Sequence, residues 1–222
     1  MNILVIGAGS EIADEFIKRC IYKKDNLFLV TRKVELKNNF NNVLIVDDYL
    51  SRKDEIVNFI KKIENLYVIF FNGALFENRP ILIPTKNEVE LTKLINFNIP
   101  YQLFNHLNNH INNIEKFVFI STMAAVRIRN KNFIYGKYKR KLEEAVLKRS
   151  NKKVLILRFG KVFTNMSEGH TTPPFSLSSS KAAEKIYKNL NKCDIIYPSY
   201  GLYLTAILIK FIPNYVFKRL KI

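Results

Sequence analysis

The stretch MNILVIGAGSEIADEF, residues 1–16, joins a short apolar run to a helical pattern through a glycine-rich turn. NILVIG has the length of a buried strand, and the following residues repeat apolar side chains at helical spacing. A helix that begins directly after such a turn offers free backbone N–H groups to a phosphate. The stretch therefore predicts a strand, a turn and a helix that bind a nucleotide pyrophosphate; a purely structural turn is the alternative. The expected contacts are Gly7, Gly9, Ser10, Glu11 and Ile12.

The rest of the chain alternates in the same way. Continuously apolar runs separated by amphipathic helical segments indicate a parallel sheet covered on both faces. We predict an α/β fold, a doubly wound parallel sheet of about seven strands, as one domain over residues 1–200 with a tail at 201–222. The expected helix at 51–64 starts with Ser51 as its N-cap, and the one at 86–113 is kinked or broken by Pro100. The further strands are expected at 26–32, 42–48, 66–74, 116–122, 152–160 and 193–198, and the further helices at 133–150 and 178–190.

Composition limits the cellular setting. Two cysteines, Cys20 and Cys193, give no disulfide framework, which favours a reducing compartment. The first apolar run is too short for a signal peptide, and no stretch of 18 apolar residues occurs. We therefore expect a cytoplasmic protein, or one peripheral on the inner face of a membrane. His106 and His110 are four residues apart, but without an acidic or cysteine partner in sequence we expect no metal site.

The formal net charge of +17 favours an anionic partner. Phosphorylated ligands and an anionic membrane surface fit this charge, and a solvated lysine-rich surface is the alternative. Nucleic acid is not expected, because the chain lacks a basic stripe interleaved with aromatic residues and lacks a zinc finger.

Residues that follow the expected strands should line the ligand site, because ligands bind at the carboxyl ends of such sheets. Arg32 and Lys33 stand after Thr31, where cations suit a 2′-phosphate, so NADP(H) is favoured and NAD(H) is possible. Asp47 is placed to reach an adenine amino group. Small residues after the fourth strand let the backbone approach a cofactor, and these are Asn72, Gly73 and Ala74.

The segment FISTMAAVRIRNKNFIYGKYK, residues 119–139, carries the expected chemistry. Tyr135 lies 13 residues after Thr122 (135 − 122 = 13), and Lys139 follows four residues later on the same helix face. A nearby ammonium lowers the pKa of a phenol, so that the tyrosine can exchange a proton with a substrate oxygen. The Thr122 hydroxyl would hold that oxygen, with Ser121 as the alternative.

Taken in order, these motifs resemble the short-chain dehydrogenases/reductases over essentially the whole chain. The resemblance implies an NADP(H)-dependent oxidoreductase that reduces a carbonyl to an alcohol, in a homo-oligomer. It makes Tyr135 the general acid/base, lets Lys139 also bind the nicotinamide ribose, and gives Asn96 a role in a water-linked proton relay. RFGKVFT, residues 158–164, resembles the family's turn beside the nicotinamide, with contacts from Gly160, Val162 and Thr164.

The sequence also departs from the family pattern. Glu11 and Ala13 replace two glycines of the first turn, Thr122 replaces the more frequent serine, and Phe159 replaces a proline. Thr122 keeps the hydroxyl, and Glu11 is expected to point outward from the start of its helix. The altered turn leaves a non-catalytic NAD(P)-binding module with a sensing or scaffolding role as the alternative function.

The last residues form an unusual tail. Leu202 to Ile212 is apolar apart from Thr205 and Lys210, and a basic, aromatic end follows Pro213. It is too short to span a bilayer, so we predict an interfacial anchor, with a core helix or an oligomer interface as alternatives. The tail, SEIA and NFIYGKYK resemble a membrane-associated subgroup that includes the decaprenylphosphoryl-2-keto-ribose reductases. That resemblance implies a lipid-linked sugar or another anionic envelope precursor as substrate.

Overall fold

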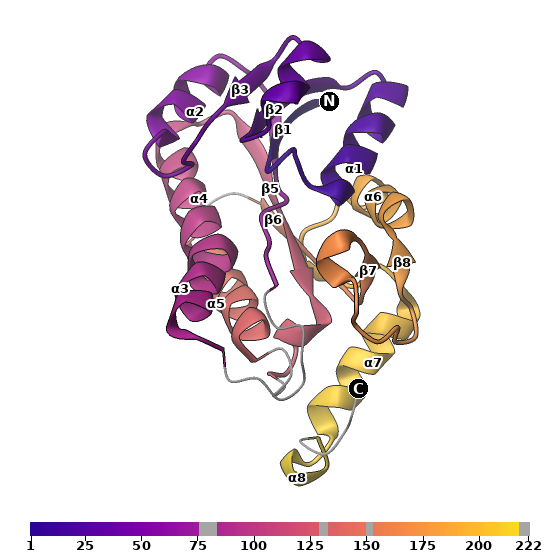
Figure 1. The fold of residues 1–222 in the computed structure, drawn as a ribbon. Coiled ribbons are helices and arrows are strands. Elements are labelled where there is room, and N and C mark those ends of the chain that lie inside the picture. The colour runs from indigo at the N-terminus through magenta and orange to yellow at the C-terminus, as the bar shows by residue number, and fades with distance from the viewer. Residues whose placement is uncertain (76–83, 129–132, 150–152, 218–222) are drawn as a thin grey trace.

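The computed structural model describes residues 1–75, 84–128, 133–149 and 153–217 and contains one large parallel sheet (Figure 1). Its seven strands have the order β3-β2-β1-β4-β5-β6-β9, and each neighbouring pair is parallel. The doubly wound α/β prediction is therefore confirmed. The strands are β1 (Asn2–Ile6), β2 (Asn26–Thr31), β3 (Val43–Ile45), β4 (Leu66–Phe70), β5 (Ile114–Thr122), β6 (Lys153–Phe159) and β9 (Asp194–Ile196).

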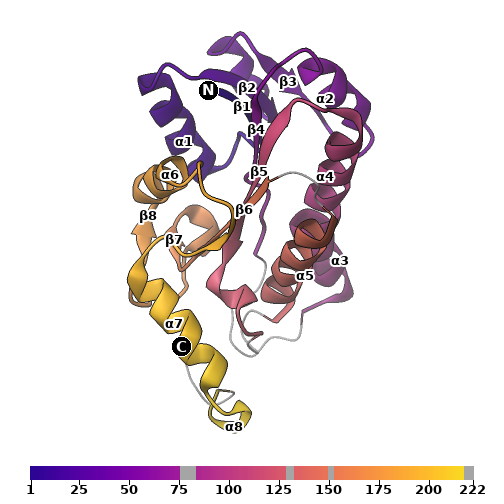
Figure 2. The same ribbon diagram turned by 180° about the vertical axis from the view of Figure 1, so that it is seen from behind.

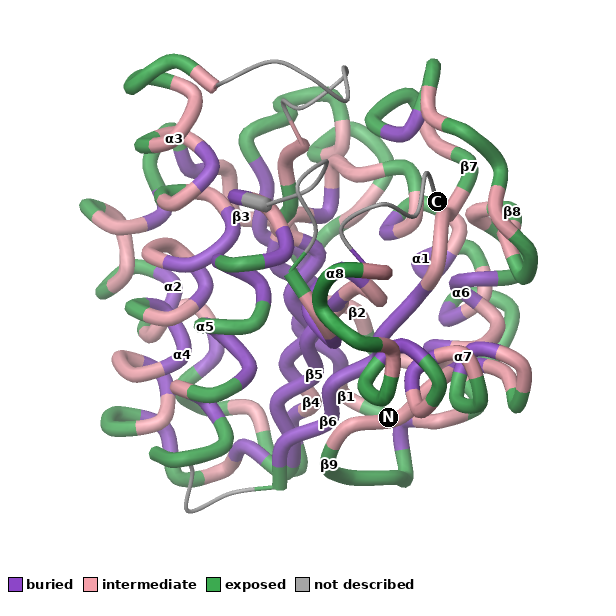
Figure 3. The backbone as a smooth tube through the Cα atoms, turned by 90° about the horizontal axis from the view of Figure 1, so that it is seen from below, coloured by how far each residue is buried: buried purple, intermediate pink, exposed green. Residues whose placement is uncertain are grey.

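Helices cover both faces of this sheet (Figures 1 and 2). On one face lie α1 (Glu11–Tyr22) and α6 (Ser179–Lys188), and on the other α2 (Lys53–Ile60), α3 (Lys86–Lys93), α4 (Ile99–His110) and α5 (Phe133–Arg149). Within β1, Leu4 and Ile6 belong to one buried cluster and Ile3 and Val5 to the other. Both faces of the strands are thus buried (purple in Figure 3), which explains why the strand sequences are apolar without alternation.

The helical region predicted at 86–113 forms three consecutive parts and ends at His110. A π-helical turn, η2 (Leu94–Asn98), separates α3 from α4. Pro100 has no N–H to donate to the carbonyl four residues back, and the Ile99 N–H donates instead to the Leu94 carbonyl, five residues back. The expected disturbance at Pro100 is therefore a π-turn just before the proline.

The expected cap of α2 is wrong. Arg52, not Ser51, is the N-cap residue, and α2 begins at Lys53. The Ser51 hydroxyl instead bonds to the Asp48 carbonyl at 3.4 Å, within a turn in which the Asp48 side chain accepts the Leu50 N–H. This turn delays the start of the helix.

A small unit that the sequence pattern did not predict follows β6. It consists of β7 (Val162–Phe163) and β8 (Leu177–Ser178), which pair with each other in parallel, and of the 3₁₀ turn η4 (Asn165–Ser167). In Figure 1 this orange segment lies beside the sheet, between α6 and the yellow helix of the tail. Two-residue strands are too short to show any periodicity in the sequence.

The tail forms two helices, α7 (Tyr200–Phe211) and α8 (Asn214–Phe217); residues 218–222 lie outside the described part of the chain. Ala206, Ile209 and Phe217 form a buried cluster with Val126, which follows β5. The Arg127 guanidinium donates to the Ile209 carbonyl at 2.7 Å and to the Ile212 carbonyl. It thereby satisfies carbonyls at the end of α7.

The other side of α7 is solvent-exposed and apolar. Among the residues described here, no helix is both long and apolar enough to cross a bilayer. The exposed large side chains of α7 and α8 are Tyr200, Tyr203, Leu204, Leu208, Phe211 and Tyr215.

Candidate active site

A cavity of about 550 Å³ lies at the carboxyl ends of the central strands. One end is formed by Gly9, Ser10, Glu11 and Ile12 of the first turn. Asn72 and Gly73 follow β4 along its floor, and Leu202, Thr205 and Ile209 of α7 close the other end. The cavity therefore joins the glycine-rich turn to the tail.

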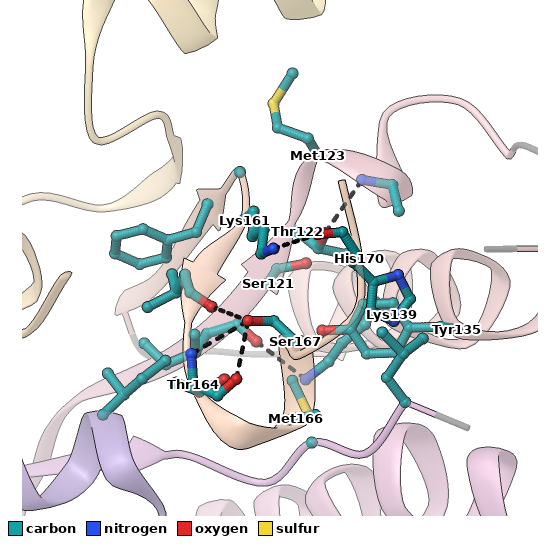
Figure 4. A pocket seen from close by; sticks show the side chains of 18 of the residues that line it. Ser121, Thr122, Met123, Tyr135, Lys139, Lys161, Thr164, Met166, Ser167 and His170 are labelled. Carbon is teal, nitrogen blue, oxygen red and sulfur yellow. Dashed lines mark hydrogen bonds between the residues drawn. The ribbon is translucent and has the colours of Figure 1, made fainter. Parts of the chain in front are cut away.

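Thr122, Tyr135 and Lys139 all line this cavity (Figure 4). Thr122 ends β5, and its hydroxyl oxygen accepts the Ala124 N–H at 3.2 Å. Tyr135 and Lys139 lie on one face of α5, with the Lys139 Nζ 5.9 Å from the centre of the Tyr135 ring. One helix and one strand end thus present a hydroxyl, a phenol and an ammonium to the same space.

Lys139 is buried and held by backbone carbonyls. Its Nζ donates to the Asn72 carbonyl at 2.9 Å and to the Ile120 carbonyl at 3.1 Å. Burial lowers the pKa of this ammonium to about 8, and the Glu143 carboxylate partly offsets that effect. The side chain therefore carries its charge at neutral pH and loses it in mildly alkaline solution.

The pKa of Tyr135 differs from the sequence expectation. Burial of the phenol raises its pKa above the ordinary value. The neighbouring ammonium was expected to lower that pKa, but Lys139 directs hydrogen bonds to two carbonyls on the cavity floor. The phenol therefore stays protonated at neutral pH.

Asn96 does not line the cavity but supports its floor. Its side-chain amide donates to the Ala74 carbonyl at 2.8 Å and to the Thr92 carbonyl at 2.9 Å, and its oxygen accepts the Ala74 N–H at 3.2 Å. The paired bonds fix the segment whose Asn72 carbonyl holds Lys139. Because Asn96 sits in the π-turn η2, the local distortion before Pro100 helps to aim it at this segment.

Ser121 has a different partner from Thr122. Its hydroxyl donates to the Glu143 carboxylate at 2.5 Å, and that carboxylate also pairs with the Arg158 guanidinium. Sequence reasoning did not single out Glu143 and Arg158. The available signals were an acidic residue one turn beyond Lys139 and an arginine inside the apolar strand VLILRF.

The first turn has the backbone geometry that was expected. Gly7 has a φ of +81°, a conformation that favours glycine. A Cβ on Gly9 would lie 2.9 Å from the Lys33 Cδ, so the Lys33 side chain crosses directly over this turn. Glu11 is exposed at the start of α1, and its carboxylate accepts the Asn165 N–H at 2.8 Å. That bond ties the start of α1 to the segment after β7.

Most of the residues expected to contact the adenosine half of the cofactor are not among the described residues that line the cavity. Lys33 lines the cavity, whereas Thr31, Arg32, Asp47 and Ala74 are not among the described lining residues. The Thr31 hydroxyl accepts the Lys33 N–H at 3.0 Å. The Asp47 carboxylate accepts the Asp48 N–H at 2.9 Å, a bond that lowers its pKa, and Arg52 lies 3.5 Å away.

Gly160, Val162 and Thr164, the residues expected beside the nicotinamide, all line the cavity. Ser167 fixes their turn: its hydroxyl accepts the Thr164 N–H at 3.1 Å and donates to the Val162 carbonyl at 2.7 Å (Figure 4). His170, in the segment 167–175 that the sequence led us to expect over the substrate, also lines the cavity.

The two histidines of α4 are placed differently from the sequence expectation. Asp54 of α2 lies beside His106, with 2.7 Å between its carboxylate and the His106 Nε2, so an acidic partner is present after all. His110 Nδ1 bonds to the His106 carbonyl. No cluster of three or more His, Cys, Asp or Glu side chains suited to a metal ion occurs in the described ranges.

The cavity residues fit a nicotinamide dinucleotide. The Asn72 side-chain oxygen is buried, lines the cavity and has no hydrogen-bond partner among the described residues. Gly73 leaves room beside Lys139, because a Cβ there would lie 3.6 Å from the Lys139 Nζ. Backbone N–H groups at the start of α1 suit a pyrophosphate, and the polar floor around Asn72 and Lys139 suits a nicotinamide riboside.

No protein-family model and no curated protein matches the sequence, but many solved structures share the fold. A short-chain dehydrogenase from Burkholderia cenocepacia in complex with NADP aligns with a TM-score of 0.80 at 13% identity, over 100% of this chain and 98% of that one. The carbonyl reductase Sniffer of D. melanogaster aligns with a TM-score of 0.72 at 18% sequence identity, over 89% of this chain and 96% of that one. The Bordetella bronchiseptica enzyme WbmH in complex with NAD+ aligns with a TM-score of 0.67 at 11% sequence identity, over 96% of this chain and 82% of that one.

Proposed function

We propose that this chain, which has the fold of the short-chain dehydrogenases/reductases, is an NADP(H)-dependent oxidoreductase that reduces a carbonyl to an alcohol. The observation that carries the proposal is the meeting of Thr122, Tyr135 and Lys139 in one cavity that reaches the glycine-rich turn. Shared fold alone does not assign an activity, whereas a hydroxyl, a phenol and an ammonium in this order form a complete proton-transfer set.

In this mechanism a bound nicotinamide dinucleotide supplies the hydride. The Thr122 hydroxyl holds the substrate oxygen by a hydrogen bond. Tyr135 donates its phenolic proton to that oxygen, and its raised pKa keeps the proton available at neutral pH. The Lys139 ammonium stabilises the phenolate left behind, and Asn96 keeps the floor under Lys139 in place.

Cofactor binding is the direct test. Titration of the protein with NADPH and with NADH, followed by cofactor fluorescence, should show binding, with NADPH the tighter ligand. Absence of binding by either would contradict the enzyme proposal. Binding without turnover of any carbonyl would favour the non-catalytic module.

Replacing Lys33 with alanine should weaken NADPH binding by about tenfold and leave NADH binding unchanged, because a charge-assisted bond to the 2′-phosphate is lost. Lys33 should matter more than Arg32, since Lys33 lines the cavity and Arg32 is not among the described lining residues. The measurement is the pair of dissociation constants for each variant. Lys37→Ala, at an exposed lysine of the same segment, is the control. An equal loss for NADH would assign Lys33 to another part of the cofactor.

We further propose that the substrate carries an apolar group and an anionic one, such as a lipid-linked sugar, and that the enzyme acts as a homo-oligomer at the cytoplasmic face of a membrane. Met123, Phe175, Leu202 and Ile209 give the cavity an apolar end beside α7. The outer face of α7 exposes aromatic and aliphatic side chains. From Ile195 to the end, the sequence has four cations and no acidic residue, which suits an anionic surface.

The double change Leu208→Ser/Phe211→Ser should lower binding to vesicles containing phosphatidylglycerol by about tenfold or more, because two exposed apolar side chains no longer enter the interface. Vesicle flotation measures the bound fraction. Ile21→Ser/Tyr22→Ser is the matched control, since these side chains are similarly exposed at the end of α1. Unchanged flotation with a smaller oligomer in solution would make this face a subunit interface instead.

A further inference from the structure

A buried polar network lies directly behind the catalytic residues. The Glu143 carboxylate accepts the Ser121 hydroxyl at 2.5 Å and receives two bonds from Arg158, from Nε at 3.0 Å and from Nη2 at 2.5 Å. Arg158 Nη1 donates to the Tyr197 hydroxyl at 2.9 Å. Glu143 and Arg158 are both buried, and neither is among the described residues that line the cavity.

Stability alone is a weak reason for such a pair. Removing two charges from water is costly, and well-packed apolar residues often replace a buried ion pair without loss of stability. A network of this kind is informative when its members belong to elements whose relative position matters for chemistry.

Two elements that carry the catalytic set, β5 and α5, and the neighbouring strand β6 meet at the Glu143 carboxylate. Ser121 immediately precedes Thr122 on β5. Glu143 lies one helical turn beyond Lys139 on α5. Arg158, paired in register with Ser121, precedes the Gly160 turn on β6. A single side chain thus links the strand end, the catalytic helix and the turn beside the nicotinamide.

We propose that Glu143 is a positioning residue of the catalytic set: through Ser121 and Arg158 it fixes the strand ends around Thr122, and it places a negative charge one turn from Lys139. The link between β5, α5 and β6 exists independently of any reaction. Its effect on turnover rests on the proposed function.

The charge has a defined consequence for Lys139. The groups that face this ammonium are the Asn72 carbonyl after β4, the Ile120 carbonyl of β5, and Tyr135 and Glu143 on its own helix. Among them Glu143 is the acidic group that opposes the lowering of the Lys139 pKa by burial. Neutralising Glu143 therefore lowers the pKa of Lys139 further, and Lys139 loses its proton at a lower pH.

The test uses Glu143→Gln combined with Arg158→Met. This pair removes both charges together, so that no unpaired charge stays buried, and glutamine keeps an acceptor for the Ser121 hydroxyl. The control is Arg140→Gln/Glu144→Gln, which neutralises an exposed ion pair at 3.0 Å on the same helix. The first readout is the pH titration of the Lys139 ¹³Cε resonance in the cofactor-free protein, assigned by its loss in Lys139→Met.

Because Glu143, and not Arg158, is the charge that raises the Lys139 pKa, the network variant should titrate Lys139 at a lower pH than wild type, and the control should titrate with wild type. If the enzyme is active, the pH at which kcat falls in alkaline solution should be lower in the network variant by the same amount. Titration of Lys139 at the same pH in all three proteins would overturn the proposal.

Ser121→Ala provides a second arm, because it leaves the ion pair in place and keeps the fold testable if the double variant does not fold. It should lower kcat about tenfold with KM unchanged, since Thr122 is held less firmly. Unchanged kcat would refute the positioning role. Because the Lys139 titration needs no cofactor or substrate, failure of the proposed function would leave that result readable on its own.

Discussion

Tyr135→Phe should lower kcat by about 10³-fold or more while leaving NADPH binding within about twofold of wild type. Phenylalanine keeps the ring that packs beside Lys139 but removes the proton that the substrate oxygen needs. Because the pKa of Tyr135 is raised, its hydroxyl carries the proton at neutral pH, and removing the hydroxyl removes that proton. Stopped-flow or steady-state oxidation of NADPH with a reducible carbonyl measures the loss, and fluorescence titration measures binding.

Tyr138→Phe is the matched control for this change. Tyr138 lies three residues later on α5, but its ring packs in the buried cluster against the sheet and does not line the cavity. Its variant should retain full turnover. If Tyr135→Phe remained active, another group would have to supply the proton, and the proposed roles of Thr122 and Lys139 would also be wrong.

Glu143→Ala alone should lower the free energy of unfolding by about 3–5 kcal/mol. The Arg158 guanidinium would remain buried without its carboxylate, and the Ser121 hydroxyl would lose its acceptor. Urea denaturation followed by circular dichroism measures the change. Most of this loss of stability comes from leaving the Arg158 guanidinium buried without a carboxylate, and less from the loss of its hydrogen bonds to Glu143.

Glu144→Ala, one residue further along the helix, should change the free energy of unfolding by less than about 0.5 kcal/mol, because its pair with Arg140 is exposed. A Glu143→Ala variant as stable as Glu144→Ala would mean that water reaches Arg158. Such a result would remove the basis for a rigid link between β5 and β6.

The sequence was informative where local pattern decides structure. The apolar run before Gly7, and the spacing of Thr122, Tyr135 and Lys139, depend on strand burial and helical periodicity, which residue types reveal directly. The same periodicity places Lys139 in the cavity. These features predicted the sheet, and the residues proposed as catalytic from them all line one cavity.

Other features depend on contacts between distant segments. The partner of Glu11 is Asn165, 154 residues away, and the partner of Ser121 is a glutamate on the next helix. No local pattern encodes such pairs. The raised pKa of Tyr135 likewise depends on how deeply the assembled site is buried. The π-turn could be anticipated only as a disturbance near Pro100, because its hydrogen bonds depend on packing.

Because α7 lines the cavity and also bears an exposed face, a ligand in the cavity and a partner on the outer face would contact the same 12-residue helix. Deletion of the tail would open the cavity, so substitutions on the outer face report on the surface more cleanly. If binding at the outer face of α7 shifts this helix, it changes the affinity for the ligand in the cavity. Thermodynamic reciprocity then requires that ligand to change the affinity of the outer face by the same factor. Substrate affinity measured with and without vesicles gives that coupling constant.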